Sequence, residues 1–163
     1  MPDNGVSVRT TVPSPPAPVV EHREVLRTAI LDLEDALAQP SFARVRPWCT
    51  LVATRAQALE AAFADHVHLT EQPGGLYDEL RSLAPELSSR LGRLQGDHVE
   101  IMSRLTGFLN GIDGGITNAS AVDEERIDAW RIEGTQLLGL LVRHRQRGID
   151  LTFEAYLVDS GGE

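Results

Sequence analysis

From residue 21 onward, apolar residues recur at intervals of three and four, and valine, isoleucine and threonine never gather into alternating runs. Such spacing is typical of amphipathic α-helices and not of β-strands. Proline and glycine residues divide the pattern into helices at about 21–39, 47–71, 76–83, 85–110 and 123–158. Four of these helices are long, and most of the links between them are short. The pattern therefore predicts an all-α fold, an up-and-down antiparallel four-helix bundle.

Two segments lack this helical pattern. Five of the nine prolines fall within residues 1–20, and a segment of this composition offers few side chains that can pack. We therefore expect a disordered, proline-rich tail over residues 1–20, followed by a bundle domain over residues 21–160. The second segment is a glycine-rich run at 111–120, which we expect to be a loop between the last two helices.

Glycines also occur inside the predicted helices, where each costs about 1 kcal/mol relative to alanine. Close approach of neighbouring helices is the explanation that we favour over a functional role. The residues concerned are Gly92, Gly96, Gly107, Gly134, Gly139 and Gly148.

Length and composition narrow the range of possible functions. The chain has 163 residues, 42% of them apolar, which fits one globular domain. It contains no lysine, and this excludes Schiff-base enzymes, pyridoxal-phosphate enzymes and P-loop proteins. Its fifteen arginines are scattered among 24 acidic residues, for a net charge of -9. This balance argues against binding to nucleic acids or anionic membranes and favours a small neutral or cationic ligand.

The single cysteine and the N-terminus indicate a compartment. Cys49 has no second cysteine with which to form a disulfide, which suits a reducing environment. The N-terminal residues include no apolar run of the kind found in signal peptides or membrane spans. We therefore expect a cytoplasmic protein.

Four of the five histidines lie on the apolar faces of the long helices, one on each helix. The four stripes are His22, Leu26, Ala29, Leu33, Leu37; Val52, Ala56, Leu59, Phe63, His66, Thr70; Leu87, Leu91, Leu94, His98, Met102, Leu105, Leu109; and Leu137, Leu141, His144, Gly148, Leu151, Ala155, Val158. The fifth histidine, His68, is two residues from His66 and falls on the opposite side of its helix. The pattern thus predicts four inward-facing imidazoles.

Four buried imidazoles need partners. An unpaired polar group in a core costs on the order of 1–3 kcal/mol, and a single histidine on an apolar face is usually a hydrogen-bonded core residue. Four of them, one from each helix, can instead share one partner. Neutral imidazoles that converge from separate helices are the ligands that a transition metal prefers, and bundle cores are where such sites are built.

At these residues the sequence resembles the hemerythrin-like (HHE cation-binding) family, a four-helix bundle around a non-haem di-iron centre. The resemblance covers residues from about 21 to 156. It is carried by Glu21-His22-Arg23-Glu24, by His66 with the Glu-x-Pro-Gly-Gly-Leu-Tyr-Asp-Glu-Leu segment that follows, by Asp97-His98-Val99-Glu100, and by His144 ahead of Glu154-Ala155-Tyr156. The resemblance implies that His22, His66, His98 and His144 are metal ligands.

The family also places a glutamate four residues after two of its histidines, and here the sequence departs from the pattern. These positions hold Thr70, after His66, and Gly148, after His144. A di-iron centre needs anionic ligands to balance its charge. Glu71 is the nearest substitute and is our fifth ligand candidate. The remaining acids near the histidines are interpreted as surface charges: Asp65, Asp97, Glu100, Asp150 and Glu154.

These observations leave three hypotheses. The first is a metal-binding protein, with iron preferred and zinc second, that binds or senses dioxygen, peroxide or nitric oxide, and is a binder rather than an enzyme. The second is a metal-free bundle in which the histidines hydrogen-bond to one another and which serves as a scaffold for an unknown protein partner. The third is a mononuclear centre with Glu71 as a ligand, for which iron-based oxidation chemistry stays open.

Overall fold

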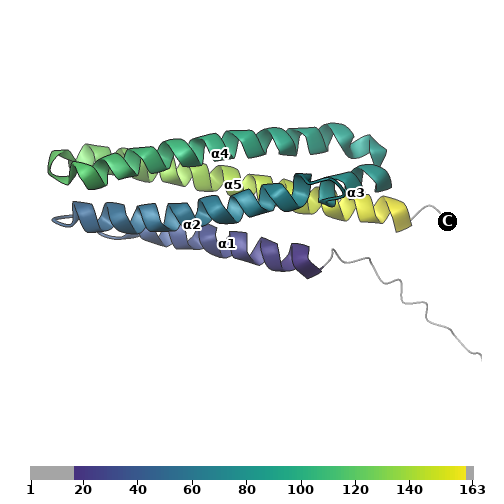
Figure 1. Ribbon diagram of the computed structural model, residues 1–163, viewed down its shortest axis with the longest axis horizontal. Helices are drawn as coiled ribbons and strands as arrows, with labels where there is room; N and C mark the ends of the chain where they lie inside the picture. The colour runs from purple at the N-terminus through teal and green to yellow at the C-terminus, as the bar shows by residue number, and fades with distance from the viewer. Residues whose placement is uncertain (1–16, 161–163) are drawn as a thin grey trace, which may run out of the picture.

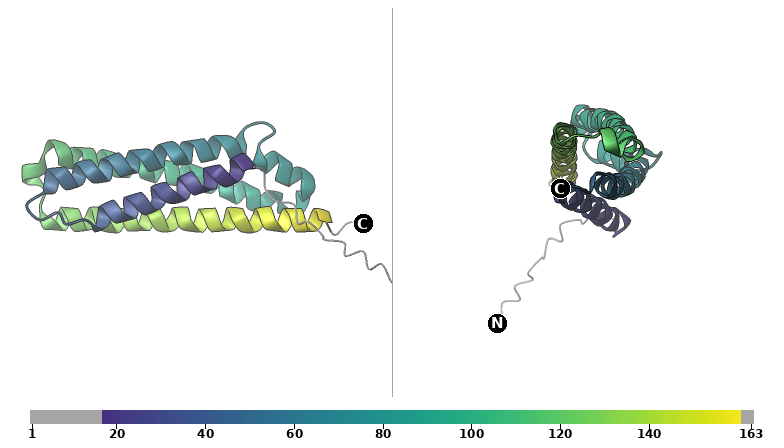
Figure 2. Two further views of the ribbon diagram at one scale, coloured as in Figure 1. Left: turned by 90° about the horizontal axis from the view of Figure 1, so that it is seen from below. Right: turned by 90° about the vertical axis from the view of Figure 1, so that its left-hand side faces the viewer.

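A computed structural model describes residues 17–160, with side chains from 20 to 157. Four long helices form an antiparallel bundle, as Figure 1 shows, and the all-α prediction is confirmed. The helices are α1 (Ala17–Ala38), α2 (Val45–Glu71), α4 (Ser88–Thr117) and α5 (Glu124–Ser160). Each packs against the next along the chain, and α1 also contacts α5, which closes the bundle. The two further views in Figure 2 show α1 crossing α2 and α5 obliquely.

A short helix, α3 (Leu76–Leu83), lies between α2 and α4 at one end of the bundle (Figure 1). The turn before it depends on two glycines. Gly74 has φ +73, a conformation that favours glycine, and a Cβ at Gly75 would lie 2.8 Å from the carbonyl oxygens of Gln72 and Leu69. The 3-10 turn η1 (Pro85–Leu87) then leads into α4, so Pro85 begins this element as expected.

The predicted apolar stripes face the interior, in two clusters of buried residues. The larger cluster involves α1, α2, α4 and α5 and includes Leu33, Val52, Leu59, Phe63, Leu105, Ile112, Leu137 and Leu141. The smaller cluster lies at the α3 end and consists of Leu76, Tyr77, Leu80, Ala84, Leu87, Leu91, Leu94, Leu151 and Ala155. Among the described side chains, the buried polar residues are Thr70, His98, His144 and Thr152.

The glycine-rich run at 111–120 is not a loop, and this prediction was wrong. Helix α4 continues to Thr117 and is followed by the 3-10 turn η2 (Ala119–Ala121). The reason is tertiary packing, because a Cβ at Gly115 would lie 2.5 Å from the Trp130 ring and 3.1 Å from Cys49 Sγ. Glycine lets α4 and α5 approach closely at this point, and that packing outweighs the poor helix propensity of the segment.

The first helix also begins earlier than expected, at Ala17 instead of residue 21. Residues 17–20 of the predicted tail are therefore helical, and the rest of that tail lies outside the described residues. Close approach of helices, the explanation that we expected for glycines inside helices, applies to Gly134, where a Cβ would lie 2.6 Å from Leu37 Cδ1. It does not apply to four others, which have no atom within 4 Å of the added Cβ: Gly92, Gly96, Gly107 and Gly148.

The two tryptophans lie together near the end of the bundle opposite α3. Trp48 of α2 and Trp130 of α5 stack with ring centroids 6.5 Å apart. Arg131 places its guanidinium over the Trp48 ring at 5.4 Å and donates hydrogen bonds to the carbonyls of Leu37 and Gln39. Within the described part of the chain, every helix is too short or too polar to cross a membrane.

Candidate metal centre

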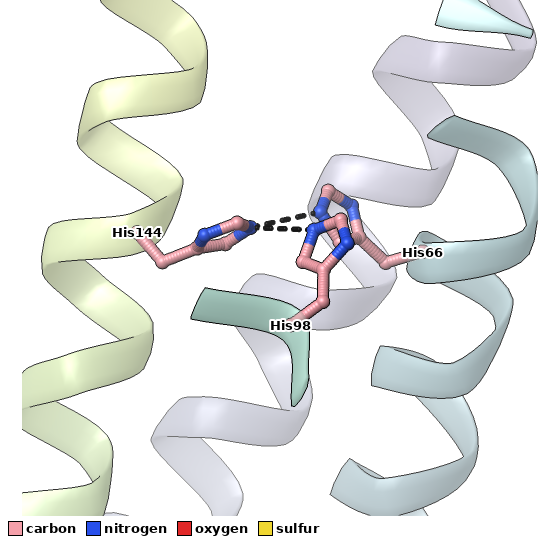
Figure 3. Close-up of side chains that lie close together, drawn as sticks. All are labelled: His66, His98 and His144. Atoms are coloured by element: carbon pink, nitrogen blue, oxygen red, sulfur yellow. Dashed lines mark hydrogen bonds between the residues drawn. The ribbon is translucent and has the colours of Figure 1, made fainter. Parts of the chain in front are cut away.

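Three of the predicted histidines meet in the interior of the bundle. His66 comes from α2, His98 from α4 and His144 from α5, and Figure 3 shows their rings pointing toward one another. The Nε2 atom of His144 lies 3.1 Å from Nε2 of His66 and 3.1 Å from Nε2 of His98. Within the described part of the chain, these three residues are the group of possible metal ligands whose ligand atoms all lie within 4.8 Å of one another. We call these residues the histidine trio.

Two members of the trio contact a carboxylate through their other ring nitrogen. Nδ1 of His98 contacts Oε1 of Glu71, and Nδ1 of His144 lies 3.3 Å from Oδ2 of Asp97. A carboxylate accepts hydrogen bonds, so the Nδ1 atom that faces it carries the proton. In a neutral ring the proton-free Nε2 then presents its lone pair to the centre of the trio. Metal-binding histidines in proteins commonly have this kind of carboxylate partner.

The spacing of the Nε2 atoms fits a shared cation. With the protons of His98 and His144 on Nδ1, their Nε2 lone pairs face each other across 3.1 Å with no hydrogen between them. Two facing acceptors repel, whereas a metal ion between them would bind both. Nitrogen ligands of a tetrahedral zinc ion lie about 3.3 Å apart, given bonds of about 2.0–2.1 Å. Two of the three pairs in the trio, His66–His144 and His98–His144, are therefore close to the spacing that a bound ion requires.

Burial keeps the imidazoles neutral. The side chains of His98 and His144 are each 2% exposed. Burial lowers the pKa of His66 to about 2, with the neighbouring imidazoles adding to the effect. Burial also lowers the pKa of His144 to about 4, although the nearby Asp97 acts to raise it. Burial lowers the pKa of His98 as well, although Glu71 acts to raise it. Neutral rings near pH 7 are the form that binds metal.

Aromatic rings enclose the trio on two sides. Phe63, which is fully buried, has its ring centroid 5.6 Å from those of His66 and His98 and 5.8 Å from that of His144. The Tyr77 ring stacks on His98 at 5.7 Å, and its hydroxyl lies 3.3 Å from His98 Nε2. Burial raises the pKa of Tyr77, so the phenol stays protonated and can donate to this nitrogen. These rings exclude water from the sides of the trio that they cover.

The other two predicted ligands lie outside the trio. The His22 ring stacks on His66 with centroids 5.9 Å apart, so the two are level along the bundle, but His22 is not part of the group of converging ligand atoms. Glu71 points to His98 Nδ1 and not to the Nε2 atoms. His68 is exposed, in agreement with its predicted outward position.

The two positions where the hemerythrin-like family has glutamate offer no ligand to the trio. The Thr70 hydroxyl bonds to backbone carbonyls, 2.8 Å from that of His66 and 3.1 Å from that of Val67. Gly148 has no side chain, and a Cβ at this position would meet nothing within 4 Å. The donor set present is therefore three imidazoles, without an anionic side chain that bridges a second ion.

Some residues around the trio could not be identified from the sequence. Asp97, expected to be a surface charge, is only 20% exposed and contacts both His144 and Arg147. Asp97 directly precedes His98, at the edge of the face that α4 turns toward α5. This position in the sequence could have indicated that its carboxylate faces His144. Arg145 directly follows His144, and its Nε atom is buried. No pattern in the sequence indicated Tyr77, which depends on where α3 packs.

Comparison of the chain with protein-family models, with curated proteins and with solved structures finds no significant match. The assignment of the site therefore depends on the geometry of the described residues. That geometry amounts to a buried group of three histidines able to hold a metal ion, within a four-helix bundle.

Proposed function

We propose that this chain is a metal-binding protein that holds one divalent transition-metal ion, iron or zinc, on the Nε2 atoms of His66, His98 and His144. The observation that carries the proposal is the contact between the Nε2 atoms of His98 and His144, at 3.1 Å, while both Nδ1 atoms face carboxylates. Imidazole suits both ions, and three histidines with a free fourth position are a known arrangement for zinc.

The charges around the trio support this proposal. Three neutral imidazoles leave the full charge of a divalent ion uncompensated, and a buried charge without a counter-charge is costly. The carboxylates of Glu71 and Asp97 supply two negative charges immediately behind the ligand rings. A metal bound here would act as a Lewis acid toward a ligand in the free position.

A single ion fits the residues better than the pair that the hemerythrin-like resemblance implies. Thr70 and Gly148 occupy the two glutamate positions, and His22 stands apart from the trio. We therefore propose a mononuclear site on a hemerythrin-like fold, and a binding function rather than catalysis. Dioxygen, peroxide or nitric oxide would be ligands of the iron form, and this expectation comes from the resemblance alone.

A second candidate is the metal-free scaffold, and one contact favours it. If His66 carries its proton on Nε2, it can donate to His144 Nε2 across their 3.1 Å separation. The Tyr77 hydroxyl can likewise donate to His98 Nε2, 3.3 Å away. The metal-free network still leaves two proton-free Nε2 atoms, those of His98 and His144, facing each other at 3.1 Å. This repulsive contact, which a metal ion would relieve, is why we favour the metal.

The test is the metal content of the purified chain after reconstitution with ferrous iron under low oxygen, or with zinc, measured by plasma mass spectrometry. We expect one metal ion per chain. His98→Ala and His144→Ala should each abolish binding, because two imidazoles cannot hold the ion in a buried site. His68→Ala, at an exposed histidine on the same helix as His66, is the matched control and should keep the metal.

Circular dichroism of each variant separates loss of a ligand from loss of the fold. Two ions per chain would overturn the mononuclear site, and a folded chain that takes up neither metal would leave the scaffold function in its place.

A further inference from the structure

Helix α5 carries a second row of uncharged residues, which faces away from the core. The helix runs the length of the bundle along one edge, as Figure 2 shows. Its core-facing stripe includes Leu137, Leu141 and Leu151, which are buried. On its outer side, exposed and half-buried residues recur at intervals of four and three, the spacing by which one helix packs along another. We call this row the α5 seam: Thr135, Gly139, Val142, Gln146, Ile149 and Phe153.

Two apolar side chains of the α5 seam are open to solvent. Val142 is 50% exposed and Phe153 is 57% exposed. The seam also borders a groove of about 580 Å³ between α5 and α1, whose wall includes Ile30, Leu138 and Val142. Single exposed apolar residues are common on protein surfaces, but an aligned row beside an apolar groove is typical of an interaction surface.

Gly139 leaves a gap in the seam. It lines the same groove, and a Cβ at this position would meet one atom within 4 Å, the Nη1 atom of the flexible Arg143 side chain at 3.3 Å. Packing against a neighbouring helix therefore does not explain this glycine. Where two helices pack along each other, each protruding side chain enters a hole on the facing helix. An open position at Gly139 is a hole for a large side chain, and the seam itself contains one, Phe153.

Two copies of the seam fit each other in antiparallel orientation. Gly139 and Phe153 each lie seven residues from Gln146. About a twofold axis at Gln146, Phe153 of each copy therefore faces Gly139 of the other. In the same register, Val142 of each copy faces Ile149 of the other, so apolar residues meet on both sides of the axis. A symmetric interface of this kind uses one surface patch twice.

The charges beside the seam agree with this register. Arg143 precedes Gln146 by three residues, Asp150 follows it by four, and both are exposed. Asp150 accepts a hydrogen bond from Gln146 at 2.8 Å and forms no ion pair within the described part of the chain. In the antiparallel pair, Arg143 of each copy faces Asp150 of the other. A parallel pair would instead place like charges together, which is unfavourable.

We propose that a second copy of this chain docks on the α5 seam and forms a symmetric dimer, in which the two α5 helices pack antiparallel about Gln146 and Phe153 of each copy enters the hole at Gly139 of the other. The dimer does not depend on the proposed metal site. Arg143 and Asp150 lie at the rim, where charges set orientation more than affinity. One helix from each copy gives a small interface, so we expect a dissociation constant in the micromolar range.

The test is the mass of the full chain in solution, measured by sedimentation velocity with a chelator present, from about 1 µM to about 200 µM. We expect the mass to rise with concentration from that of one chain toward that of two. Phe153→Glu, which places a charge in the interface, and Gly139→Gln, which fills the hole, should each raise the dissociation constant at least about tenfold. Val99→Glu, at an exposed apolar residue of α4, is the matched control and should dimerise like the parent.

Two further experiments test the antiparallel register. Arg143→Glu and Asp150→Arg should each weaken the dimer, and their combination should restore it, because the exchanged charges again face each other across the axis. Gln146→Cys places two thiols at the axis, so a short bismaleimide should link the two chains. Gln136→Cys, at an exposed glutamine of α5 outside the seam, should give little linked product.

Sedimentation as a single chain at every concentration would overturn the proposal. A dimer that persists unchanged in both Phe153→Glu and Gly139→Gln overturns it too, as does cross-linking of Gln146→Cys no stronger than that of Gln136→Cys. Circular dichroism checks the fold of each variant. If Phe153→Glu fails to fold, Gly139→Gln decides the question, because its Cβ meets only the end of a flexible side chain.

Discussion

The interior of the bundle has two regions of opposite character. Between the tryptophan pair and Phe63 the core is apolar, with Leu59, Leu105 and Ile112 fully buried. The region on the α3 side of Phe63, which begins with the layer of the histidine trio, holds all the buried polar residues of the described side chains: Thr70, His98, His144 and Thr152. The same helices run through both regions with the same apolar spacing. This difference shows that burial of apolar side chains is enough to stabilise the first region, whereas the second region also needs specific partners for its polar groups.

The largest expected effect lies in the apolar region. Leu105→Ala should lower the free energy of unfolding by about 3 kcal/mol, because it removes a fully buried side chain and leaves a cavity. The loss should be the same with and without zinc, as measured by urea denaturation. A loss of stability that depends on zinc would contradict the distinction between the two regions.

A second substitution in the apolar region tests the close approach of α4 and α5. Gly115→Ala should cost about 2 kcal/mol, because the added Cβ would lie 2.5 Å from the Trp130 ring. Gly107→Ala on the same helix is the control. Its Cβ meets nothing within 4 Å, so it should raise stability by up to about 1 kcal/mol. Thermal denaturation of both variants measures the effect, and two shifts of the same sign would refute the packing argument.

In the histidine layer, Asp97→Asn should weaken zinc binding at least about tenfold, since outer carboxylates orient the ligand ring and offset the charge of the ion. Stability without zinc should change little. Competition with a chromophoric chelator measures the affinity. Glu100→Gln removes an exposed acid on the same helix, paired with Arg104, and should bind zinc like the parent. Equal affinities for all three proteins would show that Asp97 has no role behind His144.

The smallest effect is a pH dependence of the metal-free protein. Burial lowers the pKa of His144 to about 4 in the folded state, whereas an unfolded histidine titrates near 6.5. Between these two pKa values, the unfolded chain binds a proton at this histidine that the folded chain does not. The free energy of unfolding should therefore fall by on the order of 1 kcal/mol for this residue between about pH 7 and about pH 5.5. Urea denaturation at both values measures it, and an unchanged slope in His144→Asn would contradict the assignment.

The sequence predicted the parts of the structure that depend on helical periodicity. The spacing of three and four identified the four long helices and placed His66, His98 and His144 on inward faces. Periodicity does not fix the height of one helix relative to another. His66 and His98 could not be aligned in advance, because their relative height depends on the path of the chain through α3.

Residues at the edges of the helix faces were the other limit. Asp97 and Arg145 each neighbour a histidine of the trio, and only the packing of α4 and α5 and of α1 and α5 decides whether such positions face a partner or solvent. The overall negative charge suggested a neutral or cationic ligand, and a metal ion agrees with this, but net charge did not indicate the two arginines that line a small cavity beside the trio. Net charge describes the long-range field of the molecule, and a buried site responds to the charges next to it.

Helix α1 differs from the other three long helices because it contributes no member of the histidine trio. A bound ion would cross-link α2, α4 and α5 and would resist their separation, while α1 would still be held by packing and by its own side-chain contacts. Local opening of the bundle would then begin with α1. Since His22, Arg23 and Leu26 of α1 also line the cavity of about 40 Å³ beside the trio, the helix that the ion would not hold is the one whose movement would open this cavity to a ligand.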